Sequence, residues 1–423
     1  METETIGETT RLSLRSNFLW NMGGTAAYAL AQWGMLVAMA KIGSPEMVGT
    51  FSLALAIAVP VTTLAALSLR SVQATDARGE YTFGTYYRLR CAGAAAAMLI
   101  IAACAYRYDA AVAMVIAIVG LAKGVESVSD IYFGLFQKEE RLDLVARSMM
   151  MKGPLSLVVL CVALLWSKDL VLGTLALLGS WTAILVLYDA RNGRRMIDRQ
   201  VTPGQSGGIF RWDTEIRLFW LALPLGVVTA LGTLQQSIPR YVIEGRMDMR
   251  SLGVFSAMIY LMNAGSMLVT ALGQAAVPRL AIQYSAGDIG SFVRLLRRLL
   301  VFGIVLGLGG VVVAWAGGER LLSLLYTPEF GGHPGAFLIL MIAGLVSNVF
   351  AFLGIALTAM RVFKTQAPVH MLIAGLNLVL CLLLVGPLGL DGAAYAVLGG
   401  LFAGTVAYSW IAVKHLYHPQ RGG

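Results

Sequence analysis

The chain has 423 residues, of which 58% are hydrophobic and only 13% are charged; its formal net charge is +9 and its mean hydropathy is +0.74. About one quarter of the residues in a soluble globular domain are charged, so this composition excludes an ordinary soluble protein. Apolar runs near the ~20 residues that a helix needs to cross a bilayer recur along the whole chain. Because alternating strands of about ten residues are absent, the sequence predicts an all-α integral membrane protein.

Twelve apolar runs in chain order are predicted to be transmembrane helices. They span residues 17–40, 47–69, 83–105, 110–136, 149–166, 169–188, 218–243, 252–276, 294–316, 335–360, 367–386 and 391–413.

The basic residues of the connections predict the orientation of these helices. If the N-terminus is cytoplasmic, 24 of the 32 lysine and arginine residues fall on the inner side and six fall on the outer side. The positive-inside rule then predicts a multi-pass protein of the inner or plasma membrane with both termini in the cytoplasm. The same distribution explains the positive net charge without a nucleic-acid partner.

The helices divide into two lobes that resemble each other. We predict a cytoplasmic tail at 1–16, a lobe at 17–188, a cytoplasmic linker at 189–217, a lobe at 218–413 and a cytoplasmic tail at 414–423. The segment "VGTFSLA" at 48–54 is echoed by "LGVFSAM" at 252–258. Six helices per repeat place both lobes in the same orientation, related by an axis along the membrane normal. A substrate path is then expected between the lobes.

The fourth predicted helix carries charges inside an apolar run. In "GLAKGVESVSDIYFGLFQKEER", Lys123, Glu126, Ser127 and Asp130 share one side of the helix. A charge at the bilayer midplane costs at least ~2.5 kcal/mol, so this side must face protein or water. Lys123 and Glu126 are spaced to pair. Asp130 is predicted to be the odd charge that takes up a proton more freely, and both carboxylates are candidates for proton coupling.

Two interpretations of this charged side remain open. One is a buried ion network that ties the helix to its neighbours. The other is a water-filled cavity in which the lysine meets an anionic substrate while the carboxylates titrate. The three charges sum to −1, which is unfavourable for binding a diphosphate unless a carboxylate is protonated.

Other polar residues of the helices are weaker candidates for the same cavity. Each can also be a hydrogen-bonding contact between helices; they are Gln32, Gln235, Asn263 and Asn348. Arg70 and Arg279 end the second and eighth predicted helices, where they are candidates for phosphate headgroup contacts at the cytoplasmic mouth. The scattered cysteines and histidines have no metal-ligand spacing, so we predict no metal site and no cofactor, with H⁺ or Na⁺ as possible coupling ions.

Two stretches resemble a known family. "SLRSVQATDARGEYTFGTYYRLR" (68–90) and "KGVESVSDIYFGLFQKEERLD" (123–143) are similar to signature segments of the polysaccharide-transporter (Wzx-like) flippases. That family belongs to the multidrug/oligosaccharidyl-lipid/polysaccharide (MOP) exporter superfamily. The resemblance implies two six-helix lobes in a V-shaped, MATE-like architecture with alternating access. It also implies a flippase that moves undecaprenyl-diphosphate-linked oligosaccharide from the cytoplasmic to the outer leaflet for O-antigen, capsule or exopolysaccharide biosynthesis.

The same resemblance implies membrane lipids as partners, together with a polysaccharide polymerase and glycosyltransferases of the same pathway. The alternative is a MATE-like multidrug or cation antiporter. Such a transporter needs a buried carboxylate in its first helix, but the first two predicted helices of this chain contain none. An enzyme is not expected, because no catalytic constellation stands outside the helices.

Overall fold

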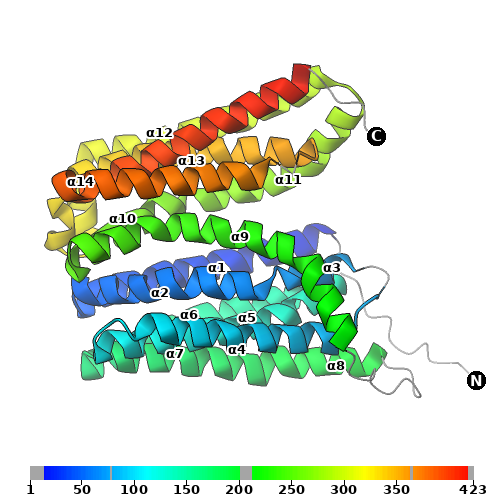
Figure 1. Cartoon of the computed structure of the whole chain (residues 1–423), viewed down its shortest axis with the longest axis horizontal. Coiled ribbons are helices and arrows are strands. Elements are labelled where there is room, and N and C mark those ends of the chain that lie inside the picture. The colour runs from blue at the N-terminus through cyan, green and yellow to red at the C-terminus, as the bar shows by residue number, and fades with distance from the viewer. Residues whose placement is uncertain (1–13, 77–78, 201–211, 363–364, 418–423) are drawn as a thin grey trace, which may run out of the picture. The chain divides into compact units, whose positions relative to one another are not determined.

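The computed structural model describes residues 14–76, 79–200, 212–362 and 365–417, and these residues form helices joined by short connections (Figure 1). In the N-terminal half the helices are α1 (Leu14–Ile42), α2 (Pro45–Ala66), α3 (Leu69–Thr75), α4 (Phe83–Ala105), α5 (Ala110–Lys138), α6 (Leu142–Ser167), α7 (Leu170–Ile184), a π-helical turn (Leu185–Asp189) and α8 (Ala190–Gln200). They continue with α9 (Trp212–Arg246), α10 (Met249–Ala264), α11 (Ser266–Ser285), α12 (Ile289–Leu325), a 3₁₀ turn (Pro328–Gly332), α13 (Pro334–Ala359) and α14 (Gln366–Tyr417).

Each of the twelve predicted spans is helical, but three of them run over two elements: 47–69 covers α2 and the start of α3, 169–188 covers α7 and the π-helical turn, and 252–276 covers α10 and α11. Within the described residues, ten helical stretches are long and apolar enough to cross a membrane. One of the ten is α14, which contains two predicted spans separated by Gly389, whose φ of 58° breaks the helical backbone. The 29-residue α1 supplies the remaining predicted span. The protein is therefore a multi-pass α-helical membrane protein, as predicted.

The chain forms two compact units. Unit 1 comprises Met1–Met35 and Val61–Val227, and unit 2 comprises Leu36–Pro60 and Val228–Gly423. The divisions fall inside α1, α2 and α9, and the division in α2 is at Pro60, where the proline interrupts the helical hydrogen bonds. The predicted lobes 17–188 and 218–413 are each continuous in sequence, whereas unit 2 also includes Leu36–Pro60. The division into these lobes stays a prediction. Residues 1–13, 201–211 and 418–423 of the predicted tails and linker lie outside the described residues.

In unit 2, glycines allow two pairs of helices to approach closely. A Cβ atom on Gly253 of α10 would lie 3.0 Å from the backbone nitrogen of Gly49 on α2. These two glycines stand at matching positions of the segments 48–54 and 252–258. A Cβ atom on Gly307 of α12 would lie 2.6 Å from the Cα atom of Leu345 on α13. Small residues at these positions let the helix backbones touch, as is usual where no hydrophobic effect drives helices together.

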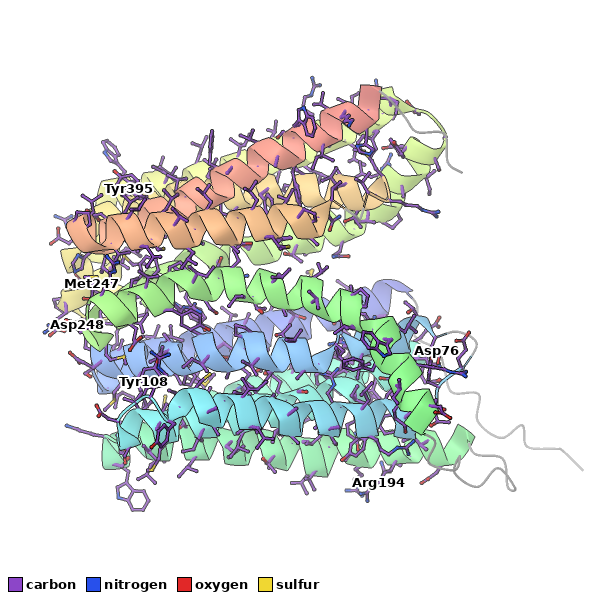
Figure 2. All side chains as sticks on the ribbon, in the orientation of Figure 1. Asp76, Tyr108, Arg194, Met247, Asp248 and Tyr395 are labelled. Carbon is purple, nitrogen blue, oxygen red and sulfur yellow. The ribbon has the colours of Figure 1, made fainter. Side chains whose placement is uncertain are left out.

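In unit 1, α5 lies at the centre and contacts α3, α4, α6, α7 and α8. Asp76, after α3, and Tyr108, after α4, lie at opposite ends of this unit (Figure 2), so α4 and α5 run antiparallel along its length. A buried cluster of Leu67, Leu69, Tyr86 and Ile131 holds α3 and α4 against α5. This packing turns the side of α5 that carries Ser127 and Asp130 towards α3 and α4.

A charged cluster around helix α5

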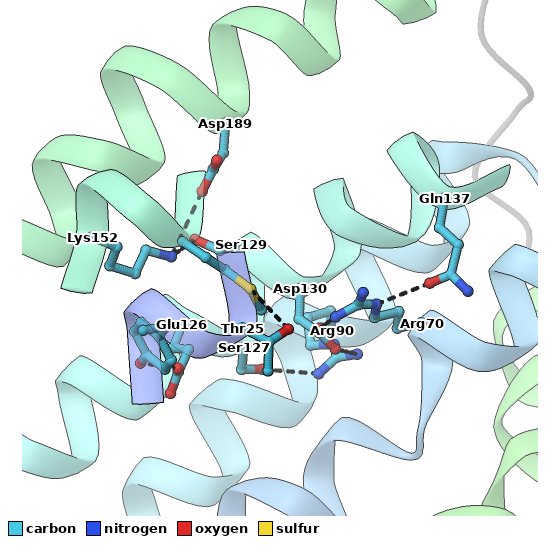
Figure 3. Close-up of polar contacts among 12 residues, drawn as sticks. Thr25, Arg70, Arg90, Glu126, Ser127, Ser129, Asp130, Gln137, Lys152 and Asp189 are labelled. Carbon is cyan, nitrogen blue, oxygen red and sulfur yellow. Dashed lines mark hydrogen bonds and ion pairs between the residues drawn. The ribbon is translucent and has the colours of Figure 1, made fainter. Parts of the chain in front are cut away.

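Asp130 of α5 is held by two arginines from different helices. The Nη1 atom of Arg70 on α3 lies 3.1 Å from Oδ1 of Asp130, and Nη2 of Arg90 on α4 lies 3.6 Å from Oδ2. Arg90 also donates to the Ser127 hydroxyl at 3.2 Å, and Arg70 donates to Gln137 at 3.3 Å. Figure 3 shows these side chains in one group. Asp130 is therefore not left without a charged partner, as α5 alone suggested, and its greater freedom to take up a proton stays a prediction.

A break between α2 and α3 places Arg70 at this position. Leu67 and Ser68 adopt left-handed backbone conformations, with φ of 52° and 50°, which residues other than glycine adopt uncommonly. The predicted span 47–69 therefore ends at Ala66, and α3 starts in a new direction. Gly134 lets α3 pack closely, since a Cβ atom there would lie 3.4 Å from the Cα atom of Arg70 and would also meet the Gln73 side chain.

The two stretches that resemble a family's signature segments thus lie against each other. Arg70 and Arg90 belong to the segment 68–90, and their partner Asp130 belongs to the segment 123–143. At the end of α3, Lys138 lies 3.7 Å from Asp76, which again joins the two segments. Three ion pairs therefore join the two segments.

Lys123 and Glu126 form a second group on the same helix. The Nζ atom of Lys123 lies 2.7 Å from Oε2 of Glu126, which confirms the expected pair. Tyr28 of α1 donates to the other carboxylate oxygen at 2.5 Å. The lysine also lies 5.1 Å from the centre of the Trp181 ring of α7, where a cation–π attraction adds to the pairing.

A third group lies behind these residues and is almost completely buried. Lys152 of α6 donates to the Ser129 hydroxyl at 3.0 Å and lies 3.7 Å from Asp189, and the two charged side chains are 2% and 0% exposed. Asp189 ends the π-helical turn after α7. Lys152 also lies 5.3 Å from the centre of the Phe133 ring. The pair links α5, α6 and α7, and its burial suits a role in holding the helices together.

Taken together, these groups carry four cations and three carboxylates, a net charge of +1, and not the −1 expected from α5 alone. The sequence analysis did not include Arg90, Lys152 and Asp189 in the site. It counted Arg90 and Lys152 among the basic residues on the cytoplasmic side of the membrane. The position of Arg90, well inside the apolar run 83–105, was the signal that could have found it. Arg70, Lys123, Glu126 and Asp130 are between 18% and 32% exposed, so the cluster has an accessible edge.

The other candidate residues lie apart from this cluster. Gln32 is half-buried on α1, four residues after Tyr28. In unit 2, Gln235 and Asn263 line a cavity, whereas Asn348 is buried and donates to the Gly303 carbonyl of α12 at 3.3 Å, a contact between helices. Arg279 is exposed on α11. The structure therefore groups Lys123, Glu126, Ser127, Asp130 and Arg70, and it places the unit 2 candidates elsewhere.

The described part of the chain contains no group of three or more histidine, cysteine, aspartate or glutamate side chains that could hold a metal ion. The charged cluster consists of paired guanidinium, ammonium and carboxylate groups. Such groups bind and release anions, because guanidinium and ammonium donors can exchange a carboxylate partner for a phosphate oxygen.

No family model matches the chain. The chain is similar to the capsular polysaccharide biosynthesis protein CapF of Staphylococcus aureus, with 26% identity over 392 residues that cover 93% of this chain and 97% of that protein. This similarity extends over almost the whole of both chains, well beyond the two segments singled out from the sequence.

Solved transporter structures share the fold. An inward-facing MATE-family multidrug resistance transporter of the MOP superfamily matches with a TM-score of 0.65 and 12% identity, covering 99% of this chain and 98% of that one. A MOP-superfamily transporter from Pyrococcus furiosus, whose binding pocket is described as having reversed polarity, matches with a TM-score of 0.66 and 12% identity over 96% and 95% of the two chains. The MATE transporter VcmN of Vibrio cholerae matches with a TM-score of 0.64 and 14% identity over 96% and 97%. The predicted resemblance is thus confirmed: this multi-pass membrane protein has the fold of MOP-superfamily transporters and is similar in sequence to a capsular polysaccharide biosynthesis protein.

Proposed function

We propose that the chain is a flippase that moves an oligosaccharide linked to a polyprenyl diphosphate from the cytoplasmic to the outer leaflet. The observation that carries the proposal is the charged cluster of unit 1, in which Arg70, Arg90 and Lys123 stand beside accessible carboxylates inside membrane-spanning helices. Intramembrane ionisable residues mark substrate pathways more often than not. The similarity to a capsular polysaccharide biosynthesis protein supports a substrate of this class.

The cluster suits a diphosphate because each of its cations has a carboxylate partner that a phosphate group can replace. In the absence of substrate, Asp130 offsets part of the charge of Arg70 and Arg90, and Glu126 pairs with Lys123, which lowers the cost of these charges inside the membrane. A diphosphate brings more negative charge than a single carboxylate, and it can accept bidentate hydrogen bonds from Arg70. The headgroup then exchanges places with Asp130 as a partner of the arginines while the lipid tail stays in the bilayer.

We also propose that the protein lies in the inner or plasma membrane with both termini in the cytoplasm, on the basis of the positive-inside distribution. In that orientation Arg70 lies towards the cytoplasmic side, where a lipid-linked substrate is assembled. A polymerase and glycosyltransferases of the same pathway would be the functional neighbours. Glu126, which accepts from both Lys123 and Tyr28, is the candidate for proton coupling.

A MATE-like antiporter for cationic drugs is the second candidate, because the fold comparisons fit it equally well. A cation site needs a carboxylate whose charge is not already neutralised. In the cluster, Glu126, Asp130 and Asp189 each lie within 4.0 Å of a lysine or arginine nitrogen. With four cations to three carboxylates, the cluster favours an anionic substrate.

The proposal is tested in cells that lack the gene, by mass spectrometry of the extracted lipids. We expect a complete polyprenyl-diphosphate oligosaccharide to accumulate, and the wild-type gene to reverse the accumulation. Lys123→Ala should fail to reverse it while the membrane content of folded protein stays normal. Lys41→Ala, which removes an exposed lysine at the end of α1, is the matched control and should behave as wild type. An unchanged lipid pool in the deletion strain would rule out the flippase.

A further inference from the structure

Unit 2 contains a cavity of about 180 Å³ between α9, α10, α13 and α14, lined by both apolar and uncharged polar residues. Its polar lining consists of amide, hydroxyl and imidazole groups, namely Gln235, Gln236, Asn263, Ser347, His370 and Asn377. Among the described residues that line the cavity there is no aspartate, glutamate, lysine or arginine. Arg240 of α9 follows the lining residue Pro239 but does not line the cavity. A cavity with this lining has neither the cations that a diphosphate needs nor the carboxylates that a cationic drug or a metal ion needs.

Several of the polar side chains are held in place by neighbours. Gln235 is 8% exposed, and its Oε1 atom lies 3.2 Å from Nδ1 of His370, which joins α9 to α14. Asn377 is 4% exposed, and its Oδ1 atom accepts from the Cys381 thiol at 3.3 Å. Buried amides on rigid helices present fixed donors and acceptors, which is what a selective site for neutral polar groups requires.

An aromatic ring completes the lining. Phe350 of α13 lines the cavity, and its ring stacks on Tyr408 with the ring centres 4.5 Å apart and an angle of 15° between the rings. The His370 ring meets Phe350 edge to face, with the ring centres 5.8 Å apart. The fixed face of an aromatic ring attracts the weakly polarised C–H groups of a sugar ring. Amides, a hydroxyl and an aromatic face are together the groups that recognise a carbohydrate.

We infer that this cavity binds a sugar of the lipid-linked oligosaccharide and sets the selectivity for its glycan. The inference rests on the proposed function and deepens it. The cavity would take an uncharged part of the substrate, because its lining offers neutral hydrogen-bonding groups. Its volume is on the scale of one monosaccharide ring and not of a whole repeat unit, so it would recognise one residue of the glycan.

The test uses full-length protein in vesicles and compares two fluorescent lipids. One is a polyprenyl diphosphate that carries the complete oligosaccharide, and the other is the same polyprenyl diphosphate without sugar. Gln235→Ala and Asn377→Ala should each lower the flipping rate of the glycosylated lipid by a few-fold to about tenfold, because each removes hydrogen bonds to the sugar. Their rates with the bare diphosphate lipid should match the wild-type rate.

Two further variants control for folding. Ser347→Ala removes a half-buried lining hydroxyl, so it keeps the test valid if a buried amide variant fails to fold, and it should give a smaller change of the same kind. Asn348→Ala changes the next residue, which bonds to Gly303 on α12 and does not line the cavity, and should leave the ratio of the two rates unchanged.

Equal slowing of both lipids by the cavity variants, or no slowing of either, would contradict the sugar site while leaving the flippase intact. Failure of the wild-type protein to move either lipid would contradict the proposed function, and the sugar site with it.

Discussion

The two units carry very different polar interiors. In unit 1, charged residues from α3, α4, α5, α6 and α7 meet in ion pairs, and in unit 2 a cavity is lined by neutral amides and an imidazole. Charges inside a membrane-spanning bundle must be paired at all times, so every cation of the cluster has a carboxylate nearby. Neutral amides have no such requirement and can stand around an open space. The difference suits a substrate that has one highly charged part and one neutral, hydroxyl-rich part.

The largest effect on stability is expected from breaking the most buried pair of unit 1. Asp189→Leu leaves Lys152 charged and without its carboxylate, which should cost about 3–5 kcal/mol of unfolding free energy. In unit 2, Asn348→Leu removes a neutral hydrogen bond and should cost about 1 kcal/mol. Denaturation in detergent measures both. The double variant Lys152→Met with Asp189→Leu should recover most of the loss; equal losses in the two units would remove the contrast between them.

The largest effect on transport is expected from Arg90, which is 1% exposed and faces both Asp130 and Ser127. Arg90→Gln should slow flipping of both the glycosylated and the bare diphosphate lipid by at least about tenfold, because a hydrogen-bonded cation at the diphosphate is worth about 1.5–3 kcal/mol. Arg90→Lys should restore part of the rate. Arg107→Gln, at an exposed arginine between α4 and α5, should have no effect. Slowing of the glycosylated lipid alone would assign Arg90 to the sugar instead.

A smaller effect, an increase in apparent affinity for the substrate, is expected from a substitution at Asp130. Asp130→Asn removes the carboxylate that competes with the substrate for Arg70 and Arg90, so the apparent affinity for the diphosphate lipid should rise a few-fold. The concentration dependence of flipping in vesicles measures this change. Complete loss of transport, with loss of its dependence on a proton gradient, would instead make Asp130 a proton carrier.

The smallest effect is expected in the connection between α3 and α4, outside the membrane. Burial raises the pKa of Asp76, but hydrogen bonds from the backbone of Glu80 and Tyr81 and the charge of Lys138 outweigh it, so the net pKa is lowered. The carboxylate therefore stabilises the fold above its ordinary pKa of about 4, and this contribution is lost as the pH falls below that value.

Asp76→Asn should accordingly lower the thermal unfolding temperature at pH 7 by a small amount, corresponding to about 1 kcal/mol or less. The difference from wild type should shrink as the pH falls below about 4. A difference that grows as the pH falls would contradict the lowered pKa. The loss of unfolding free energy should be well below that of Asp189→Leu. This difference would distinguish a residue of the connection between α3 and α4 from the buried pair of Lys152 and Asp189.

Local sequence patterns predicted the helices well. Each apolar run is helical, although 47–69, 169–188 and 252–276 are each divided between two elements. The shared side of Lys123, Glu126 and Asp130 on α5 followed from helical geometry, as did the pair of Lys123 with Glu126. The break at Leu67 and Ser68 could not be predicted, because it depends on left-handed backbone conformations stabilised by packing against other helices.

The ion-pair partners that come from other helices could not be predicted from the sequence either. Arg90 is 40 residues before Asp130 in the chain, and Asp189 is 37 residues after Lys152, so no periodicity connects them. The cavity of unit 2 was only partly foreseen. Gln235 and Asn263 were expected to face a cavity, but Asn377 and Ser347 became part of it only when α13 and α14 folded against α9. Asn348, next to Ser347, points instead to Gly303.

The most direct test of the account is movement of the lipid itself. Purified protein would be placed in vesicles that contain a fluorescent polyprenyl-diphosphate oligosaccharide in both leaflets, and a reductant that cannot cross the membrane would bleach the outer leaflet. Protein-free vesicles should keep the fluorescence of the inner leaflet. We predict that wild-type protein lets the reductant bleach nearly all of the lipid, and that Arg90→Gln restores most of the protection. Full protection with folded wild-type protein, with or without an ion gradient, would contradict the proposal that the chain is a flippase.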